Sequence, residues 1–305
     1  MHKNTDIKAK KALGQNFLQN PAVCDKIFKS ANLHQDNLVL EIGPGLGALT
    51  KFVLGGSSYA ILAEKDPECY AHLKTQIALL YPSAALVCFK QRQQKFEADG
   101  EFKTNNHSKK IMLLNCDALQ LDIKDALLEF NKVFNTNFAE LCIIGNLPYN
   151  IGTLLVYKWC EGDIDFVKSI TIMLQKEVVM RIVASNTSQH YGKLSVIVQS
   201  AFSVRHLFDI SKGNFRPEPS VMSSVARLER LDGYFKINRQ ELSKFCEVIF
   251  RQRRKTLANL VKNTAYQQFF NLEANKPLLS KRSDELDTQK LLKLFTDYCL
   301  ATKND

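Results

Sequence analysis

Short apolar runs, separated by polar stretches, recur along the first two thirds of the chain. Each run is six or seven residues long, and most are followed by a glycine, an amide or an acidic residue, which favours a buried strand over a helix. The predicted strands are 37–42, 58–63, 110–115, 139–145 and 169–174. Helical patterns lie between several of them, and strands that alternate with helices form a mostly parallel sheet. This part is therefore predicted to be α/β with a doubly wound sheet.

Apolar residues at helical spacing mark the other elements. Asn20-Pro21 is a helix-start signal, with an N-cap residue followed by proline at the first position. Further helices are expected at 153–160 and from Gln175 onward. In the last third, 241–250 carries an apolar stripe and 284–300 is an amphipathic helix. The C-terminal part is thus predicted to be mostly helical.

Composition adds a division into domains and an anionic partner. Hydrophobic residues make up 45% and charged residues 24% of 305 residues, as in a soluble globular protein with room for one large and one smaller domain. The net charge of +10 suggests a polyanion as partner, and residues 207–305 hold 18 basic against 12 acidic side chains. We predict a larger domain at 1–206 and a basic, mostly helical domain at 207–305.

Several classes of protein are disfavoured. The eight cysteines show no C-x-x-C spacing, and the six histidines show no H-x-x-x-H or H-E-x-x-H pattern, so no metal site is predicted. No apolar run reaches the about 18 residues of a membrane span, and the basic N-terminus lacks the apolar core of a signal peptide. A reduced, cytoplasmic protein is expected. A transit peptide is the alternative, but Asp6 and the absence of arginine from the N-terminal segment argue against one.

Two stretches fall outside this pattern. Residues 1–19 form a basic, then turn-like N-terminal arm whose end, 14–18, could contact a ligand. Residues 88–110 are polar and charged, which predicts a surface insertion that is flexible at least in part. Lys109 and Lys110 are expected in a solvated loop there, with an RNA contact as the alternative.

Residues that can bind a nucleotide follow the predicted strands directly. Strand 37–42 leads into the turn Gly43-Pro44-Gly45-Leu46-Gly47, which lets a ligand approach the backbone closely. Glu64, about 20 residues past the first glycine, suits a carboxylate that accepts hydrogen bonds from ribose hydroxyls. Asp117 could accept an adenine amino group or cap the following turn. The pattern is compatible with NAD or S-adenosylmethionine, although the G-x-G-x-G spacing lacks the dinucleotide fingerprint.

The strand 139–145 ends in Asn146-Leu147-Pro148-Tyr149. An amide at the carboxyl end of a strand is presented to a ligand by a rigid scaffold. The Asn146 side chain and a backbone carbonyl could accept two hydrogen bonds from an exocyclic amino group, beside the flat face of Tyr149. A β-turn with a core tyrosine is the alternative.

Two later stretches carry aromatic and basic groups. Phe215 and Arg216 lie in a proline-rich loop, where Phe215 could stack on a flipped base or fill the core. The cluster Arg253-Arg254-Lys255 could contact phosphates or form a solvated surface.

Taken together, these stretches resemble the rRNA adenine N6-dimethyltransferase family, most closely its small-subunit branch. The matching stretches are 14–18, 41–47, 64–66, 116–118, 145–150, 174–178, 191–195, 215–221 and 253–255. Departures are the insertion at 88–110 and Lys65, where an apolar residue is common in the family.

The resemblance implies a Rossmann-like methyltransferase sheet at 1–206 and an RNA-binding domain at 207–305. It implies S-adenosylmethionine as cofactor, with contacts at Asn16, Leu18, Gly43, Gly45, Glu64, Asp117 and Asn146. The target adenine would be held by Asn146 and Leu147 and stacked by Tyr149 and Phe215. RNA contacts are expected at Arg216, Arg253, Arg254 and Lys255.

The expected reaction is N6,N6-dimethylation of two adjacent adenines near the 3′ end of small-subunit rRNA, in an assembling small ribosomal subunit and linked to its assembly. The protein is expected to act as a monomer. Alternatives are a large-subunit adenine methyltransferase of the macrolide-resistance type and a non-catalytic rRNA-binding assembly factor. A cysteine nucleophile finds no support, because the tetrapeptide that follows strand 139–145 contains no cysteine.

Overall fold

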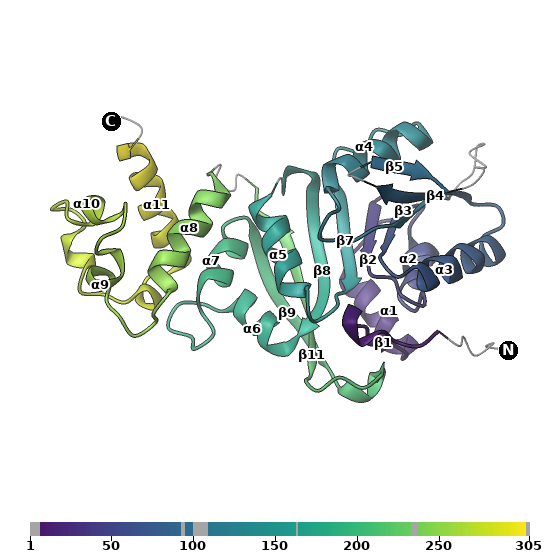
Figure 1. Cartoon of the computed structure of the whole chain (residues 1–305), viewed down its shortest axis with the longest axis horizontal. Helices are drawn as coiled ribbons and strands as arrows, with labels where there is room; N and C mark the ends of the chain where they lie inside the picture. Colours follow the sequence, from purple (N-terminus) through teal and green to yellow (C-terminus); the bar gives the residue numbers. More distant parts are fainter. Residues whose placement is uncertain (1–6, 93–94, 100–108, 163, 233–236, 303–305) are drawn as a thin grey trace. The chain divides into compact units, whose positions relative to one another are not determined.

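The computed structural model describes residues 7–92, 95–99, 109–162, 164–232 and 237–302 and contains a large mixed sheet (Figure 1). In this described part the sheet has nine strands in the order β5-β4-β6-β3-β2-β7-β8-β11-β9. The strands are β2 (Leu38–Ile42), β3 (Tyr59–Glu64), β4 (Ala85–Arg92), β5 (Lys95–Ala98), β6 (Lys110–Asn115), β7 (Leu141–Asn146), β8 (Val167–Gln175), β9 (Phe202–Ile210) and β11 (Ser223–Arg230). The six strands β4-β6-β3-β2-β7-β8 are each parallel to the next one in the sheet. The pairs β5–β4 and β8–β11 are antiparallel.

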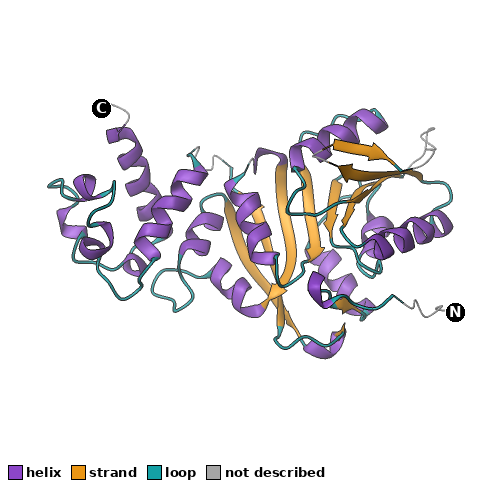
Figure 2. Cartoon of the chain, in the orientation of Figure 1, coloured by secondary structure: helices purple, strands orange, loops and turns teal. Residues whose placement is uncertain are grey.

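Helices cover both faces of this sheet (Figure 2). The helices α1 (Pro21–Ser30), α2 (Thr50–Gly56) and α3 (Pro67–Leu80) share one hydrophobic core with alternate residues of the strands, such as Ala60 and Leu62 of β3. Tyr59 points to the opposite face, where its ring meets Phe130 of α4 (Ile123–Phe134) edge-on. The predicted doubly wound, mostly parallel α/β sheet is therefore confirmed.

Local sequence explains where the strands and helices begin. All five side chains of β2 are buried, as expected for a central parallel strand with helices on both faces. Asn20, Asp66 and Asp122 are the N-caps of α1, α3 and α4, and each accepts a hydrogen bond from a backbone N–H of the first turn. The predicted strands agree with the observed ones within a few residues.

The N-terminal arm pairs with a distant segment. Its β1 (Phe17–Leu18) forms a two-stranded antiparallel sheet with β10 (Phe215–Arg216), in which Leu18 lies opposite Phe215. A 3-10 helix, η1 (Lys11–Leu13), precedes β1. The described part of the arm, from residue 7, is thus paired with a segment almost 200 residues away in the sequence.

The chain divides by its contacts into two compact units. The first contains 1–155, 165–176 and 205–229, and the second contains 156–164, 177–204 and 230–305. The predicted boundary after residue 206 falls inside β9, a strand of the central sheet, so the division follows the fold and not one point in the sequence. The assignment of methyl transfer and RNA binding to two domains stays a prediction.

The second unit is mostly helical, as predicted for the C-terminal part. The described helices that lie wholly or mostly in this unit are α5 (Gly152–Glu161), α6 (Lys176–Val183), α7 (Lys193–Gln199), α8 (Arg239–Phe250), α9 (Leu257–Val261), α10 (Gln267–Phe270) and α11 (Thr288–Thr302). The first residues of α5 and of α6 belong to the first unit. Phe245 of α8 packs against Phe295 of α11 with ring centroids 5.6 Å apart.

The predicted insertion at 88–110 contains the end of β4 and all of β5, while 93–94 and 100–108 lie outside the described residues. The expectation of a solvated loop is wrong for its last two lysines. The Lys109 ammonium donates to the carbonyl oxygens of Leu54 and Ser57 at the end of α2. Lys110 begins β6, and its ammonium donates to the Phe134 carbonyl at 2.9 Å. Both ammonium groups therefore satisfy carbonyl groups at helix ends.

Candidate functional site

The carboxyl ends of β2, β3, β6 and β7 meet at one edge of the sheet and surround a cavity. Its empty space measures about 1070 Å³, part of it open to solvent, which is enough for a nucleotide-sized ligand. The lining comes from residues 12–18 of the arm, 41–46, 48–49, 63–65, 116–118 and 146–151. All of these residues belong to the first unit.

The glycine turn after β2 adopts a backbone that other residues avoid. Gly43, Gly45 and Gly47 have φ of +66°, +58° and +81°. A Cβ on Gly45 would lie 3.1 Å from the ring of Phe17, so the arm packs directly on the turn. The Gly45 N–H donates to Oε2 of Glu64 at 2.8 Å.

Glu64 is held between two backbone N–H groups. Its Oε1 accepts from Asp66 N at 2.7 Å and its Oε2 accepts from Gly45 N, while only 5% of the residue is exposed. Burial raises the pKa of this carboxyl, and the two N–H donors oppose that shift. Because each carboxylate oxygen carries a second lone pair, the fixed group can still accept from a ligand hydroxyl.

Asp117 caps a turn and also lies at the cavity, while its role as a ligand acceptor stays a prediction. Its Oδ1 accepts from Leu119 N at 3.0 Å, which makes the turn cap, and the residue also lines the cavity. Its Oδ2 accepts from the Lys65 ammonium at 2.7 Å.

Asn146 is the last residue of β7, and its side chain is held in one orientation. Nδ2 donates to the backbone carbonyl of Asn16 at 3.0 Å. A carbonyl can only accept, so the nitrogen must face Asn16 and Oδ1 is left as the acceptor on the other side. The arm therefore sets the direction of the amide that was predicted to bind an amino group.

Tyr149 lies on the turn after Asn146 and lines the same cavity. Its hydroxyl forms a hydrogen bond with the hydroxyl of Ser223 on β11. Burial raises the pKa of the Tyr149 phenol, so it stays protonated near neutral pH. Leu147 also lines the cavity and is 1% exposed.

Phe215 is not brought to the cavity surface. It is 5% exposed and belongs to the same hydrophobic core as Leu18, its partner across the two short strands. Core filling, the alternative weighed for this residue, describes its place in this structure, and base stacking by Phe215 stays a prediction. The neighbouring Arg216 is exposed.

The sequence reasoning missed Glu41 in β2. Its side chain lines the cavity and is 1% exposed, and Oε2 has no hydrogen-bond partner in the described part of the chain. Burial raises the pKa of this carboxyl to about 8. The signal was present, because an acid inside an otherwise apolar strand costs free energy unless a partner or a ligand meets it.

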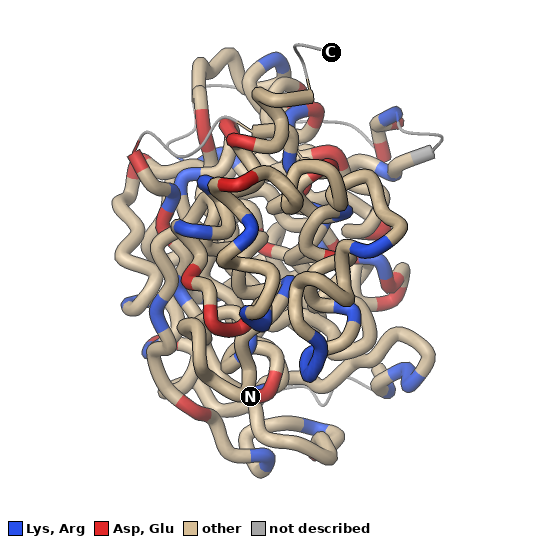
Figure 3. Tube along the Cα trace, turned by 90° about the vertical axis from the view of Figure 1, so that its left-hand side faces the viewer, with Lys and Arg blue, Asp and Glu red and all other residues tan. Residues whose placement is uncertain are grey.

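The basic cluster after α8 contains two kinds of side chain. The guanidinium of Arg253 donates to Asp284 at 3.2 Å and to the carbonyl oxygens of Ser188 and Gln189. Arg253, Arg254 and Lys255 are all exposed. Basic and acidic residues are interspersed along this helical region (Figure 3).

The described residues lack two further kinds of feature. They contain no group of three or more His, Cys, Asp or Glu side chains arranged to hold a metal ion. None of their helices is long and apolar enough to cross a membrane.

Comparisons with known proteins agree along nearly the whole chain. Residues 6–295 match the sequence model of the family described as "Ribosomal RNA adenine dimethylase". A relative named "Ribosomal RNA small subunit methyltransferase A", from Wolbachia sp. subsp. Brugia malayi (strain TRS), is 33% identical over 300 residues, covering 98% of each chain. One of the same name from Ureaplasma parvum serovar 3 is 31% identical over 292 residues, covering 93% of this chain and 92% of the relative.

Solved structures share the fold. A dimethyladenosine transferase from Plasmodium falciparum superposes with a TM-score of 0.69 at 22% identity, covering 92% of this chain and 97% of that chain. The 23S rRNA methyltransferase ErmE superposes with a TM-score of 0.62 at 18% identity, covering 92% and 98%. These similarities confirm the predicted methyltransferase type of sheet.

Proposed function

Because the chain belongs to the ribosomal RNA adenine dimethylase family, we propose that it transfers methyl groups from S-adenosylmethionine to the N6 atoms of two adjacent adenines near the 3′ end of small-subunit rRNA. The family membership agrees with the resemblance seen in the sequence. The relatives named for the small subunit, at 31% and 33% identity, support this substrate over the large-subunit one.

The cavity fits this cofactor. Glu64 presents two fixed carboxylate oxygens for ribose hydroxyls, and Asp117 presents an acceptor for the adenine amino group. Gly43 and Gly45 have no side chain between the backbone and a ligand, and the buried Oε2 of Glu41, near this turn, has no partner among the described residues. Asn16 and Leu18 close the cavity from the arm. When bound, the cofactor would supply a methyl group on a sulfonium, and breaking the S–CH3 bond would release a neutral thioether, which is a good leaving group.

Asn146 and Leu147 would hold the target amine. Oδ1 of Asn146 and the Leu147 carbonyl accept the two N6 hydrogens, which orients the nitrogen lone pair for attack. No covalent bond to the enzyme is needed, so these residues act by orientation and electrostatics. The half-buried ring of Tyr149, held through its hydroxyl by Ser223, offers a face for the adenine. Stacking contributes about 1 to 3 kcal/mol per base, which offsets part of the cost of extruding the nucleotide.

The observation that carries this proposal is the Asn146–Asn16 hydrogen bond, because it leaves an amide oxygen as acceptor in a cavity that suits the cofactor. A non-catalytic rRNA-binding factor has no need for this arrangement. A large-subunit enzyme would need it equally, so the substrate must be tested directly.

The test is to incubate the protein with labelled S-adenosylmethionine and small ribosomal subunits that lack the modification, with large subunits in parallel, and then to analyse nucleosides. Dimethyladenosine in small-subunit RNA alone is the expected result. Label in large-subunit RNA would assign the macrolide-resistance type of reaction. If neither RNA is labelled, and the parent gives no more label than Asn146→Ala, the result would favour the non-catalytic factor.

Other parts of the proposal concern the setting of the reaction. Arg216, Arg253, Arg254 and Lys255 are exposed and are proposed to contact RNA phosphates. Arg253 also holds the backbone at Ser188 and Gln189. The eight cysteines are free thiols, which supports a cytoplasmic location. Action as a monomer and a link to small-subunit assembly are further parts of this proposal.

A further inference from the structure

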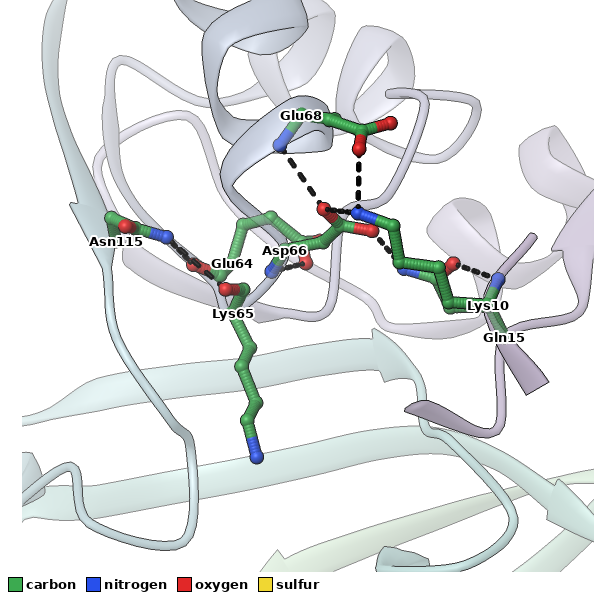
Figure 4. A network of polar contacts seen from close by, with 7 residues as sticks. All are labelled: Lys10, Gln15, Glu64, Lys65, Asp66, Glu68 and Asn115. Carbon is green, nitrogen blue, oxygen red and sulfur yellow. Dashed lines mark hydrogen bonds and ion pairs between the residues drawn. The ribbon is translucent and has the colours of Figure 1, made fainter. Parts of the chain in front are cut away.

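The carboxylate of Asp66 contacts two side chains of the N-terminal arm (Figure 4). The ammonium of Lys10 lies 2.6 Å from Oδ1 of Asp66, and Nε2 of Gln15 donates to Oδ2 at 2.9 Å. The Gln15 side chain also accepts from the backbone N–H of Lys10 at 2.8 Å, so the two arm residues brace each other. Lys10 makes a second ion pair with Glu68 at 3.0 Å.

Asp66 is placed unusually for a helix cap. It follows β3, and Oδ1 caps α3 by accepting from Glu68 N at 3.0 Å. Its residue exposure is 0%, whereas Asp122, the equivalent cap of α4, is exposed. A cap needs one oxygen, and a buried carboxylate is costly without partners. Burial opposes ionisation, yet the hydrogen bonds from Lys10 and Gln15 hold the pKa of Asp66 below its usual value.

The fastened part of the arm leads directly to the amide of Asn146. Gln15 is followed by Asn16, whose carbonyl accepts from Nδ2 of Asn146. Asp66 is also connected to the glycine turn. Its backbone N–H donates to the carboxylate of Glu64, which also accepts from the Gly45 N–H. One network of hydrogen bonds thus joins the glycine turn, the ribose acceptor and the arm.

We propose that Asp66 is a positioning residue for methyl transfer, which holds the arm so that the Asn16 carbonyl aims the Asn146 amide at the target amine. The inference rests on the proposed function. The arm also carries Asn16 and Leu18 into the cavity lining, so its release would widen the cavity and free the Asn146 side chain to rotate.

The variant that tests this is Asp66→Asn. Asparagine remains a good helix cap, but it removes the charge that attracts Lys10 and turns one acceptor oxygen into a donor. Asp122→Asn is the matched control, because it makes the same change at an exposed cap, where Oδ1 accepts from Asp125 N at 3.0 Å. Lys10→Met removes the other partner, and Lys29→Met, which removes an exposed ion pair with Asp25, is its control.

Two readouts are measured on the full chain. The first is the rate at which trypsin releases a product beginning at Ala12, by cleavage after Lys11 in the arm. The second is kcat and KM for methyl transfer, with S-adenosylmethionine affinity by calorimetry and the melting temperature alongside. We expect Asp66→Asn to speed cleavage after Lys11 by about tenfold or more and to lower kcat by a similar factor. Lys10→Met should likewise speed cleavage and lower kcat. Both control variants should match the parent in cleavage rate and kcat.

The outcomes separate the inference from the proposed function. An active parent with unchanged kcat and arm cleavage in Asp66→Asn would overturn the inference alone. Faster cleavage throughout the chain with a lowered melting temperature would also overturn it, because that describes a folding role. A parent without methyl transfer in the presence of bound cofactor would overturn the proposed function and with it the positioning role.

Discussion

The ammonium of Lys65 lies 2.7 Å from Oδ2 of Asp117, the carboxylate proposed to accept the adenine amino group of the cofactor. The Lys65 side chain points away from Asp66 and from the Lys10 side chain that contacts it (Figure 4). Asp117 is already held at Oδ1 by Leu119 N, so the ammonium takes up acceptor capacity at the remaining oxygen. A ligand amino group would therefore share this oxygen with Lys65 or displace it.

Lys65→Met should tighten binding of S-adenosylmethionine by about two- to fivefold at low salt. The Lys65 side chain is 52% exposed, so this ion pair is worth at most about 1 kcal/mol, and salt should narrow the difference between variant and parent. Calorimetry at two salt concentrations measures both effects. Lys65→Arg keeps the ion pair and should bind within about twofold of the parent. Weaker binding by Lys65→Met would mean that the ammonium itself contacts the cofactor.

Gly45→Ala should weaken both the fold and the cofactor site. At φ +58° an alanine costs about 1 to 2 kcal/mol, and its Cβ would press on the Phe17 ring at 3.1 Å, which displaces the arm. Urea unfolding should show this loss, and calorimetry should show cofactor affinity about tenfold lower, equivalent to about 1.4 kcal/mol.

Gly55→Ala is the matched control for that substitution. Gly55 lies in α2, and a Cβ there meets nothing within 4 Å. Because alanine is the better helix former, this variant should be as stable as the parent or up to about 1 kcal/mol more stable. Equal stability losses in the two variants would contradict the importance of the left-handed turn.

The local elements were predictable because their signals are local. A short apolar run followed by Asn-Leu-Pro-Tyr placed Asn146 at the end of a strand, and β7 ends at that residue. Asn20 before Pro21 predicted the start of α1, which Asn20 caps. Asp117 was weighed as a ligand acceptor or a turn cap, and its Oδ1 caps the turn, while the ligand role stays a prediction.

The contacts that orient the site were not predictable from one sequence. Asn16 and Asn146 are 130 residues apart, so their hydrogen bond depends on the path of the arm. Lys109 in a polar stretch gave no sign that its ammonium reaches carbonyl groups at the end of α2. A charged residue reads as solvated until the fold supplies its neighbours, which is why Lys109 was interpreted wrongly and Glu41 was missed.

Glu41→Gln should change how stability depends on pH. Burial holds the pKa of Glu41 near 8 in the folded chain, against an ordinary value of 4.5 when unfolded. Between these values the unfolded state releases the proton and the folded state keeps it, so this carboxyl lowers stability as pH rises from about 5 to 8. Each unit of the shift corresponds to about 1.4 kcal/mol, so the variant should gain a few kcal/mol over the parent at pH 8.

The measurement for Glu41 is urea unfolding of parent and glutamine variant at pH 5 and pH 8. Glu64 also has a raised pKa, but it is present in both proteins and largely cancels in the difference. If the free energy of unfolding changes equally in parent and variant between pH 5 and pH 8, Glu41 is solvated or finds a partner when it ionises.

Arg254 and Arg253 should respond differently to loss of charge, although they are neighbours. Arg254 is exposed, so Arg254→Gln should weaken RNA binding at all sequences, reduce the slope of log affinity against log salt by about 1, and leave the melting temperature unchanged. Arg253 holds the carbonyl oxygens of Ser188 and Gln189 and the Asp284 carboxylate, so Arg253→Gln should lower the melting temperature. Filter binding at several salt concentrations and thermal unfolding separate the two effects. An unchanged salt slope in Arg254→Gln would remove that side chain from the proposed RNA contacts.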